Sequence, residues 1–363
     1  MRAMTNQLIL LVATGLYCLF TSFFLKAQPA LPPAMFTSNP ALKTILANWQ
    51  GTPLAANGRF VNQEFAFQHG LGSVLKWKWG AKPQKAEKKA DKWRVEVVKD
   101  GHFLEGTADV IAWLGHSSFY VRVGGKQFLF DPVFYNASIV KRKSELPVAP
   151  ERFKNIDYVL VSHAHYDHCS KSSLQLIAKN SPNVQFFSGL GMQSLLQKWT
   201  QKPTQEAGWY QQYNTDTTQV SIYFLPTRHW SNRGLSDANK RLWGAFVVQI
   251  NGRTLYFGGD TGYGTHYQTA AQLFPNIDVA FVAIGAYAPR WFMAPNHQDV
   301  AEAVRGFQEL NAKVMLPMHY ATFDQTDEPF GEPLRELEKA KKTITAGKIE
   351  ILKVGETFKM PPL

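Results

Sequence analysis

Cysteine is almost absent from this chain of 363 residues, which contains only Cys18 and Cys169. This excludes the disulfide framework that staples small secreted domains, although it leaves the redox compartment open. No internal repeat is visible at the level of sequence identity. Disorder over most of the chain is also excluded, because 45% of the residues are hydrophobic and 18% are charged, which is typical of a globular protein.

Acidic residues are the scarcer charged class, since 28 Asp and Glu face 39 Lys and Arg, for a formal net charge of +11. A chain this basic attracts an anionic partner, and charge alone leaves open a membrane surface, a nucleic acid or a phosphorylated substrate. Much of the excess lies in residues 76–99, hereafter the basic segment, where nine basic and three acidic residues give a net +6. A solvated linker and an anion-facing patch are both open interpretations.

The basic segment overlaps Val74–Trp79, in which tryptophan alternates with lysine. This composition suits the interfacial layer of a bilayer, where aromatic rings lie among the headgroups. A half-buried strand explains the alternation equally well. Residues 28–105 are interpreted as an N-terminal extension with a basic and aromatic segment, and prolines at 29, 32, 33 and 40 predict that it starts as an extended chain.

Residues 8–25 form an 18-residue run without a charged side chain, between Arg2 and Lys26. The run is longer than the roughly 7–15 apolar residues of a signal peptide, and it lies at the short end of the roughly 17–25 that span a bilayer. We interpret residues 1–27 as a membrane anchor, with a signal peptide cleaved after Ala27 as the alternative. Both interpretations predict a membrane-associated or exported protein, with the remaining chain on the extracytoplasmic face.

From about residue 106 strand-like and helix-like stretches alternate, which predicts one α/β layered domain over residues 106–363. Short apolar runs predict its strands, and Gly124-Gly125 and Asn251-Gly252 predict two hairpin turns. Strands are expected at 110–114, 119–123, 127–130, 158–161, 184–187, 220–225, 245–250, 254–257, 279–284 and 314–316, and helices at 172–178, 264–273 and 299–310.

The buried-strand pattern of residues 158–161 ends in a dense polar cluster, His163-Ala164-His165-Tyr166-Asp167-His168. Ionisable groups this dense at a strand end need compensation. Neutral imidazole and carboxylate are the ligands that suit zinc and related divalent ions. His163 and His165 lie on the same side of an extended segment, whereas Asp167 and His168 follow at a turn, from which they could reach a second ion.

Three more polar residues follow apolar strands in the same way, namely His229, Asp260 and His319. Strand ends are where α/β sheets gather their site residues, so these residues complete a set of seven candidate ligands. At these motifs the chain resembles the metallo-β-lactamase superfamily, whose pattern is His-x-His-x-Asp-His followed by His, Asp and His on successive strand ends. The resemblance implies an α/β fold of the αββα four-layer sandwich type, preceded here by the N-terminal apolar segment and extension.

The resemblance also implies a centre of two divalent ions, expected to be Zn²⁺, with Mn²⁺ and Fe²⁺ as alternatives. One ion is expected on His163, His165 and His229 and the other on Asp167, His168 and His319, with Asp260 between them. Two metals about 3.5–4 Å apart activate water and hold the oxygens of a displacement reaction, which predicts a hydrolase. His116 and Asp131, also at strand ends, are expected to support the ligands by hydrogen bonds, with a capping role for Asp131 as the alternative.

Longer motifs narrow the range of possible substrates. From about residue 105 onward the chain resembles the N-acyl-phosphatidylethanolamine-hydrolysing phospholipase D branch, on residues 113–116, 229–231, 242–244, 259–263 and 284–293. The resemblance implies a phosphodiesterase that releases N-acylethanolamine and phosphatidic acid.

Individual residues receive roles in this hypothesis. Asp167 and His297 are expected to be catalytic, with His297 serving the leaving oxygen. Arg290 is expected to hold the phosphate, and Tyr287 and Trp291 to line an acyl passage. A contact with the start of the following helix is the alternative for His297, and core packing is the alternative for the aromatic residues.

Competing functions remain distinguishable. A lactone or sugar-phosphate lactone hydrolase of the same fold would keep all seven ligands and is the alternative function. No nucleic-acid partner is expected, because the positive charge is concentrated away from the metal motifs. Intact ligands argue against a non-catalytic membrane protein. A phospholipid or membrane surface is the expected partner, and a homodimer is one option for the oligomeric state.

Overall fold

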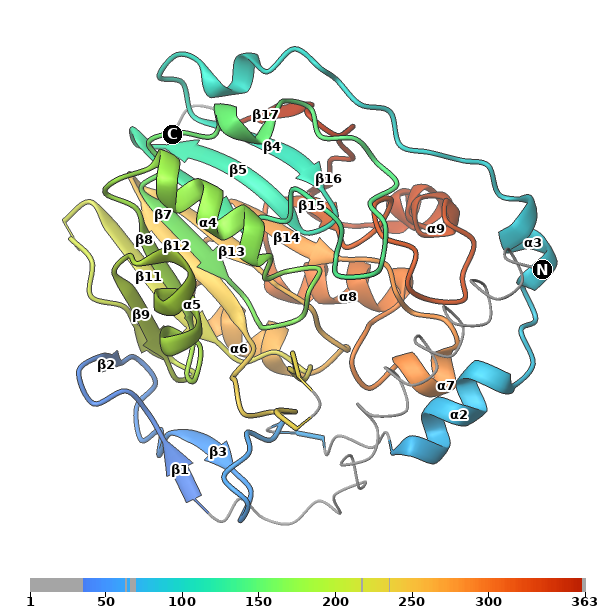
Figure 1. Ribbon diagram of the computed structural model, residues 1–363, viewed down its shortest axis with the longest axis horizontal. Coiled ribbons are helices and arrows are strands. Elements are labelled where there is room, and N and C mark those ends of the chain that lie inside the picture. The colour runs from blue at the N-terminus through green and yellow to red at the C-terminus, as the bar shows by residue number, and fades with distance from the viewer. Residues whose placement is uncertain (1–34, 63, 66–69, 217, 235, 361–363) are drawn as a thin grey trace, which may run out of the picture.

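The computed structural model describes residues 35–62, 64–65, 70–216, 218–234 and 236–360. Two large β-sheets face each other and enclose the main hydrophobic core (Figure 1). The apolar run 8–25 lies outside the described residues, and within them no helix is both long and apolar enough to cross a bilayer. The anchor or signal peptide therefore stays a prediction.

The first sheet has seven strands in the order β17-β4-β5-β6-β7-β8-β9. All residues of β4 and β5 are buried, because both faces of this sheet are covered. In β4, Ile111 and Trp113 belong to the core between the sheets, whereas Val110 and Leu114 belong to a second core under the outer helices. The strands are β4 (Val110–Gly115), β5 (Ser118–Val123), β6 (Lys126–Phe130), β7 (Tyr158–Val161), β8 (Gln185–Gly189), β9 (Thr204–Ala207) and β17 (Thr357–Lys359).

The second sheet has eight strands in the order β16-β15-β14-β13-β12-β11-β10-β2. They are β2 (Lys43–Thr44), β10 (Gln211–Gln212), β11 (Val220–Leu225), β12 (Ala245–Ile250), β13 (Arg253–Phe257), β14 (Val279–Ala283), β15 (Val314–Met318) and β16 (Lys348–Ile349). A separate antiparallel pair joins β1 (Met35–Thr37) to β3 (Thr52–Leu54).

The two large sheets repeat one pattern of pairing. Three antiparallel strands, β4-β5-β6 in one sheet and β11-β12-β13 in the other, are each followed by parallel strands, β7-β8-β9 and β14-β15-β16. The similarity is one of topology, because no repeat is visible in the sequence. In this correspondence β13, which precedes Asp260, is the counterpart of β6, which precedes Asp131.

Both predicted hairpins are confirmed. Gly124 and Gly125 join β5 to β6 with φ of 55° and 75°, and Asn251 and Gly252 join β12 to β13 with φ of 46° and 71°. Positive φ at both central residues is the type I′ geometry that glycine and asparagine tolerate best. Each expected strand and helix of the 106–363 region is also found, with its ends shifted by at most two residues.

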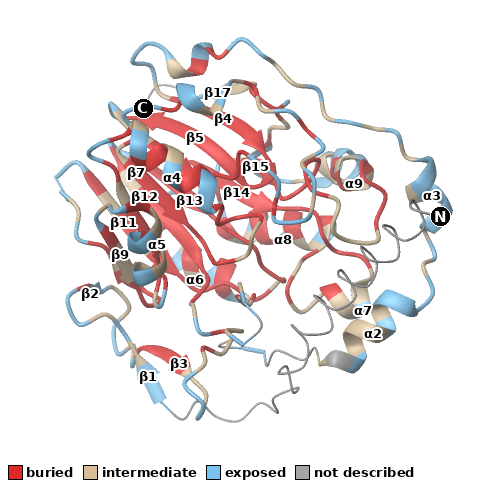
Figure 2. Cartoon of the chain, viewed as in Figure 1, coloured by how far each residue is buried: buried red, intermediate tan, exposed pale blue. Residues whose placement is uncertain are grey.

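Helices cover the outer face of each sheet. Residues of α4 (Lys171–Asn180) and α5 (Gln193–Thr200) pack on the seven-stranded sheet, and α6 (His266–Leu273) and α8 (Val300–Leu310) lie behind the eight-stranded sheet (Figure 1). The buried strands between exposed helix faces stand out in Figure 2. The expected αββα sandwich is thus confirmed. The remaining helical elements are α2 (Leu71–Trp79), α3 (Lys85–Ala90), α7 (Arg290–Met293), α9 (Glu332–Ala340), η1 (His102–Leu104), η2 (Pro150–Arg152) and η3 (Lys341–Thr343).

The half-buried strand, one of the two alternatives for Val74–Trp79, is wrong, because these residues lie in helix α2. Residues two apart on a helix are rotated by about 200°, so Trp77 and Trp79 still point to different sides. Trp77 stacks on Phe292 of α7 with ring centroids 4.9 Å apart, whereas Trp79 is 76% exposed. An alternation of tryptophan and lysine therefore arises here from a short helix with one packed and one exposed aromatic face.

Candidate metal centre

The structure brings all seven predicted ligands together. They follow the carboxyl ends of β7, β11, β13 and β15, from both sheets. Two groups of four residues have ligand atoms within 4.8 Å of one another, namely His163, His165, His229 and Asp260, and His116, Asp167, His168 and His319. The sheets supply the geometry, because backbone pairing fixes where each strand ends.

The first group has three imidazoles around one point. Nδ1 of His165 lies 2.9 Å from Nε2 of His163 and 3.2 Å from Nε2 of His229. Oδ2 of Asp260 lies 3.9 Å from Nε2 of His163 and 3.7 Å from Nε2 of His229. The arrangement matches the ligand set that the resemblance implied for one ion.

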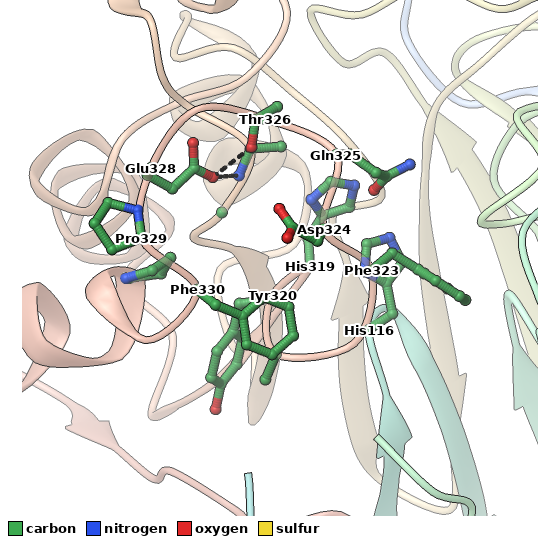
Figure 3. A pocket seen from close by; sticks show the side chains of 14 residues that line it. His116, His319, Tyr320, Phe323, Asp324, Gln325, Thr326, Glu328, Pro329 and Phe330 are labelled. Carbon is green, nitrogen blue, oxygen red and sulfur yellow. Dashed lines mark hydrogen bonds between the residues drawn. The ribbon is translucent and has the colours of Figure 1, made fainter. Parts of the chain in front are cut away.

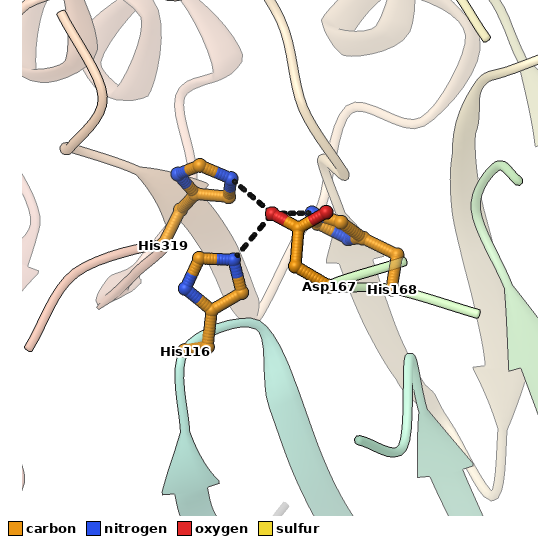
Figure 4. A group of neighbouring side chains, drawn as sticks. All are labelled: His116, Asp167, His168 and His319. Carbon is orange, nitrogen blue, oxygen red and sulfur yellow. Dashed lines mark hydrogen bonds and ion pairs between the residues drawn. The ribbon is translucent and has the colours of Figure 1, made fainter. Parts of the chain in front are cut away.

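The second group is centred on the Asp167 carboxylate (Figure 4). Its Oδ2 lies 3.6 Å from Nε2 of both His168 and His319, and 3.0 Å from Nε2 of His116. Asp260 reaches this group too, with Oδ1 3.2 Å from Nε2 of His168 and Oδ2 2.9 Å from Nε2 of His319. Asp260 therefore lies between the two groups, as expected for a bridging ligand.

Hydrogen bonds behind the imidazoles decide which ring nitrogens face the centre. Asp131 Oδ2 accepts from Nδ1 of His168 at 2.7 Å and from the Ser162 hydroxyl at 2.6 Å. Because that hydroxyl donates to Asp131, it must accept from Nδ1 of His163, 2.9 Å away. His229 in turn donates Nδ1–H to the carbonyl oxygen of Asn296 at 3.0 Å. In the neutral rings of His163, His168 and His229, the Nε2 atoms therefore carry the lone pairs and can bind metal.

Several atoms of the centre are buried without a hydrogen bond, namely Nε2 of His168, Nε2 of His319 and Oδ1 of Asp260. A buried polar atom without a partner is costly, and converging lone pairs repel one another. A cation at the centre removes both penalties. The donor set of imidazole nitrogen and carboxylate oxygen is the one that zinc and similar divalent ions accept.

Electrostatics agree with neutral imidazoles in the first group. Burial, reinforced by the His168 imidazole, lowers the pKa of His163 well below its usual value, and burial lowers the pKa of His165 to about 4. In the second group burial acts against the charged form of His168, but the carboxylates of Asp260 and Asp167 outweigh it and raise the pKa of His168 well above its usual value. A metal ion would take the place of that proton.

Close backbone approach shapes the centre at two glycines. Gly259 has φ of +57°, a conformation that other residues rarely adopt, and a Cβ there would make a tight contact of 3.0 Å with the Gly244 carbonyl oxygen. A Cβ on Gly285 would lie about 2.2 Å from the carbonyl oxygen of His319. These contacts let the Asp260 and His319 loops pass within van der Waals distance of their neighbours.

His297 also lies at the centre. Its ring centroid is 5.0 Å from that of His229 and 5.3 Å from that of His319, and its Nδ1 is buried without a hydrogen bond. Burial lowers the pKa of His297 to about 3, so the ring is neutral at pH 7. Its role in catalysis stays a prediction, and its position beside both metal groups favours that role over a helix contact alone.

The predicted substrate residues lie farther out. The Arg290 guanidinium donates to Glu302 at 2.6 Å and to the carbonyl oxygen of His297 at 2.8 Å, so its charge is already balanced within the protein. Tyr287 is buried and donates its hydroxyl to Glu332, whereas Trp291 is 48% exposed. Their roles stay predictions, and the contacts of Arg290 favour positioning of His297 over direct phosphate binding.

Sequence reasoning missed four residues that touch the ligands, namely Asn62, Ser162, Asn296 and Gln325. Asn62 exchanges hydrogen bonds with the backbone N–H and carbonyl oxygen of His229, and Gln325 donates to Asp167 at 3.0 Å. Ser162 directly precedes the histidine cluster, which could have drawn attention to it. Asn62 and Gln325 carry no local signal, because they reach the centre only through the folding of distant loops.

Comparisons with known proteins agree with this geometry. Residues 126–320 match the family model described as a beta-lactamase superfamily domain. N-acyl-phosphatidylethanolamine-hydrolyzing phospholipase D 1 of Caenorhabditis elegans is 31% identical over 268 residues, which cover 68% of this chain and 74% of that protein. The mitochondrial N-acyl-phosphatidylethanolamine-hydrolyzing phospholipase D of Saccharomyces cerevisiae is 31% identical over 237 residues, but they span only 50% of that protein.

A solved structure of a metallo hydrolase from the archaeon Ignicoccus hospitalis superposes with a TM-score of 0.51 and 24% identity, covering 69% of this chain and 97% of the other. At that identity the likeness concerns the fold. The superposition therefore supports the αββα sandwich fold.

Proposed function

Since the chain belongs to the beta-lactamase superfamily and is a metal-dependent hydrolase, we propose that it is a two-zinc phosphodiesterase that cleaves N-acyl-phosphatidylethanolamine. The observation that carries the proposal is the convergence of imidazole and carboxylate lone pairs on two adjacent points. Asp131, Ser162 and Asn296 fix the donors that would otherwise face inward. Such a centre suits two ions better than one.

Some residues of the centre would bind the metal ions, and others would contact the substrate. His163, His165 and His229 would hold one ion and Asp167, His168 and His319 the other, and Asp260 lies within reach of both groups. Divalent ions bound there supply Lewis acidity and lower the pKa of water. Neutral His297 is half-buried beside both groups, and its ring would face the leaving oxygen and stabilise the charge that develops on it.

The substrate class rests on the two phospholipase D relatives and on the motifs shared with that branch. Cleavage yields phosphatidic acid and N-acylethanolamine. The alternative, hydrolysis of a lactone or a sugar-phosphate lactone, would use the same seven ligands. The two proposals differ in the product that they release, and one assay can compare them.

We also propose that the protein acts on a membrane surface, at an extracytoplasmic face. Trp79 and Trp291 are large exposed aromatic residues on α2 and α7, and Lys76 lies 4.8 Å above the Trp291 ring. Helix α7 ends four residues before His297, whose backbone N–H donates to Met293, so a bilayer bound at this face would lie close to the centre. Exposed tryptophan among lysines is a composition that lipid headgroups attract.

Fluorescence can test this docking face. Brominated lipids in anionic vesicles should quench the tryptophan emission of the full-length protein, and quenching should fall in the Trp79→Phe/Trp291→Phe variant. A Trp199→Phe variant, altered on helix α5, is the matched control. Equal quenching in both variants would rule out α2 and α7 as the lipid-facing surface.

The function itself is tested with full-length, metal-replete protein in mixed micelles of N-acyl-phosphatidylethanolamine. Mass spectrometry should detect N-acylethanolamine and phosphatidic acid in equal amounts, and His165→Ala should abolish both. Turnover of lactones without any release of N-acylethanolamine would sink the phospholipase proposal and favour the alternative.

A further inference from the structure

The loop between β15 and α9 reaches one of the proposed ligands in the His163–His168 cluster. Nε2 of Gln325 donates to Oδ2 of Asp167 at 3.0 Å, the same oxygen to which His116 donates. A carboxylate can only accept, so the amide nitrogen of Gln325 must face it. That oxygen is the one equidistant from His168 and His319, at 3.6 Å.

Gln325 belongs to the wall of a hollow beside the centre, with His116, His319, Phe323, Asp324 and Phe330 (Figure 3). We propose that Gln325 is a positioning residue for the Asp167 ligand, and that the basic segment holds it in place. The inference rests on the two-metal site of the proposed function. It adds Gln325 to that site and the basic segment as the structure that holds Gln325.

The loop between β15 and α9 needs outside support, because it contains no strand or helix to fix Gln325. Its two flanking carboxylates supply that support. Asp324 pairs with Lys88 and Lys143, both at 2.5 Å. Lys88 also donates to the carbonyl oxygen of Thr326. Lys88 of the basic segment therefore contacts both neighbours of Gln325 in the chain, Asp324 and Thr326.

Asp327 forms the second attachment. Its Oδ2 accepts from the Trp77 indole at 2.9 Å and from Lys82 at 2.7 Å. Farther along, Asp91 accepts from the backbone N–H of Gly331 at 3.0 Å and pairs with Arg335. The basic segment therefore contacts the loop along its length. The anionic groups that the basic segment contacts therefore include carboxylates of the protein's own loop between β15 and α9. These contacts favour the anion-facing patch over the solvated linker.

Burial separates the lysines that support the loop from those that do not. Lys82 and Lys88 keep only 24% and 26% of their side chains exposed. Lys85 and Lys89, on the same short helix α3 as Lys88, are exposed. The segment thus offers matched pairs, in which the charge is the same and only the contact with the loop differs.

Metal release tests the proposal without using enzyme activity. Protein loaded with two zinc ions is mixed with a chromophoric chelator, and the two release steps are timed. Gln325→Leu should speed one step by about 10-fold, in the range found when hydrogen-bond partners of metal ligands are removed. Gln325→Asn, which is too short to reach Asp167, should do the same with little change in packing.

The basic segment is tested in the same assay. Lys88→Gln should speed the same release step by a smaller factor that grows with salt concentration, because salt screens the remaining attachments. Lys89→Gln should match the unaltered protein. Unchanged release in both Gln325 variants, or equal acceleration of both steps, would overturn the positioning role, and equal behaviour of Lys88→Gln and Lys89→Gln would overturn the support by the basic segment.

The outcome is separable from that of the proposed function. If no lipid is hydrolysed but one zinc ion leaves faster from Gln325→Leu, the substrate assignment fails and the positioning role stands. If lipid is hydrolysed and zinc release does not change, the reverse holds.

Discussion

Replacing Asp131 by asparagine should disable both halves of the metal centre, although Asp131 touches neither proposed ion. Its Oδ1 accepts from the backbone N–H of Ser162 at 2.7 Å, and its Oδ2 accepts from the Ser162 hydroxyl at 2.6 Å and from Nδ1 of His168 at 2.7 Å. An asparagine that keeps the backbone contact must turn its NH₂ group toward the other two donors.

The consequences follow from proton positions. The new NH₂ group excludes a proton on Nδ1 of His168, so the proton moves to Nε2, the atom that should bind metal. The Ser162 hydroxyl accepts from the NH₂ group and turns its own proton toward Nδ1 of His163, 2.9 Å away. His163 then also carries its proton on Nε2. One substitution therefore blocks one ligand in each group.

Loss of such a support typically costs a factor of about 10–100 in metal affinity, or roughly 1.4–2.7 kcal/mol at each site. Elemental analysis after dialysis and chelator competition would measure this loss for both ions. Ser162→Ala should weaken the site of His163 alone, because the bond between Asp131 and His168 remains. Asp109→Asn, which alters a carboxylate at the exposed β5-β6 hairpin, is the control. Two ions held by Asp131→Asn with unaltered affinity would refute the reasoning.

Three further predictions concern catalysis and stability. His297→Ala should lower kcat by about 10²-fold, the usual scale for a lost proton-transfer or oxyanion group, while elemental analysis shows unchanged metal content. Removal of the metals with a chelator should lower the melting temperature in differential scanning fluorimetry, because metal binding then no longer favours the folded state. Burial would raise the pKa of Asp324, but hydrogen bonds from Lys143 and Lys88 outweigh it and lower that pKa. Its carboxylate therefore stabilises the fold above its ordinary pKa and loses this effect as the pH falls through the lowered value. Asp324→Asn should flatten the loss of urea stability as the pH falls below about 5. An equally steep loss in the variant would contradict this assignment.

The basic segment shows where a local pattern misleads. Alternating tryptophan and lysine in residues 74–79 is compatible with a strand, a helix or a lipid-facing stretch. The segment is too short to distinguish the period of a strand from the period of a helix. The structure forms a helix there because Trp77 finds Phe292 and Asp327, residues more than 200 positions away. Tertiary contact decided the secondary structure.

The sequence by itself determined the fold class and the candidate ligands. Strand periodicity and hairpin dipeptides are local signals that can be read from a short stretch of sequence. The metal-binding chemistry of imidazoles and carboxylates at strand ends follows from the residue type alone. Only the tertiary structure decided which ring nitrogen each histidine turns inward, through Asp131 and Asn296, and that Gln325 reaches Asp167 across 158 positions of chain. Such contacts depend on how loops close over the sheets, and the spacing of residues along a chain does not encode that closure.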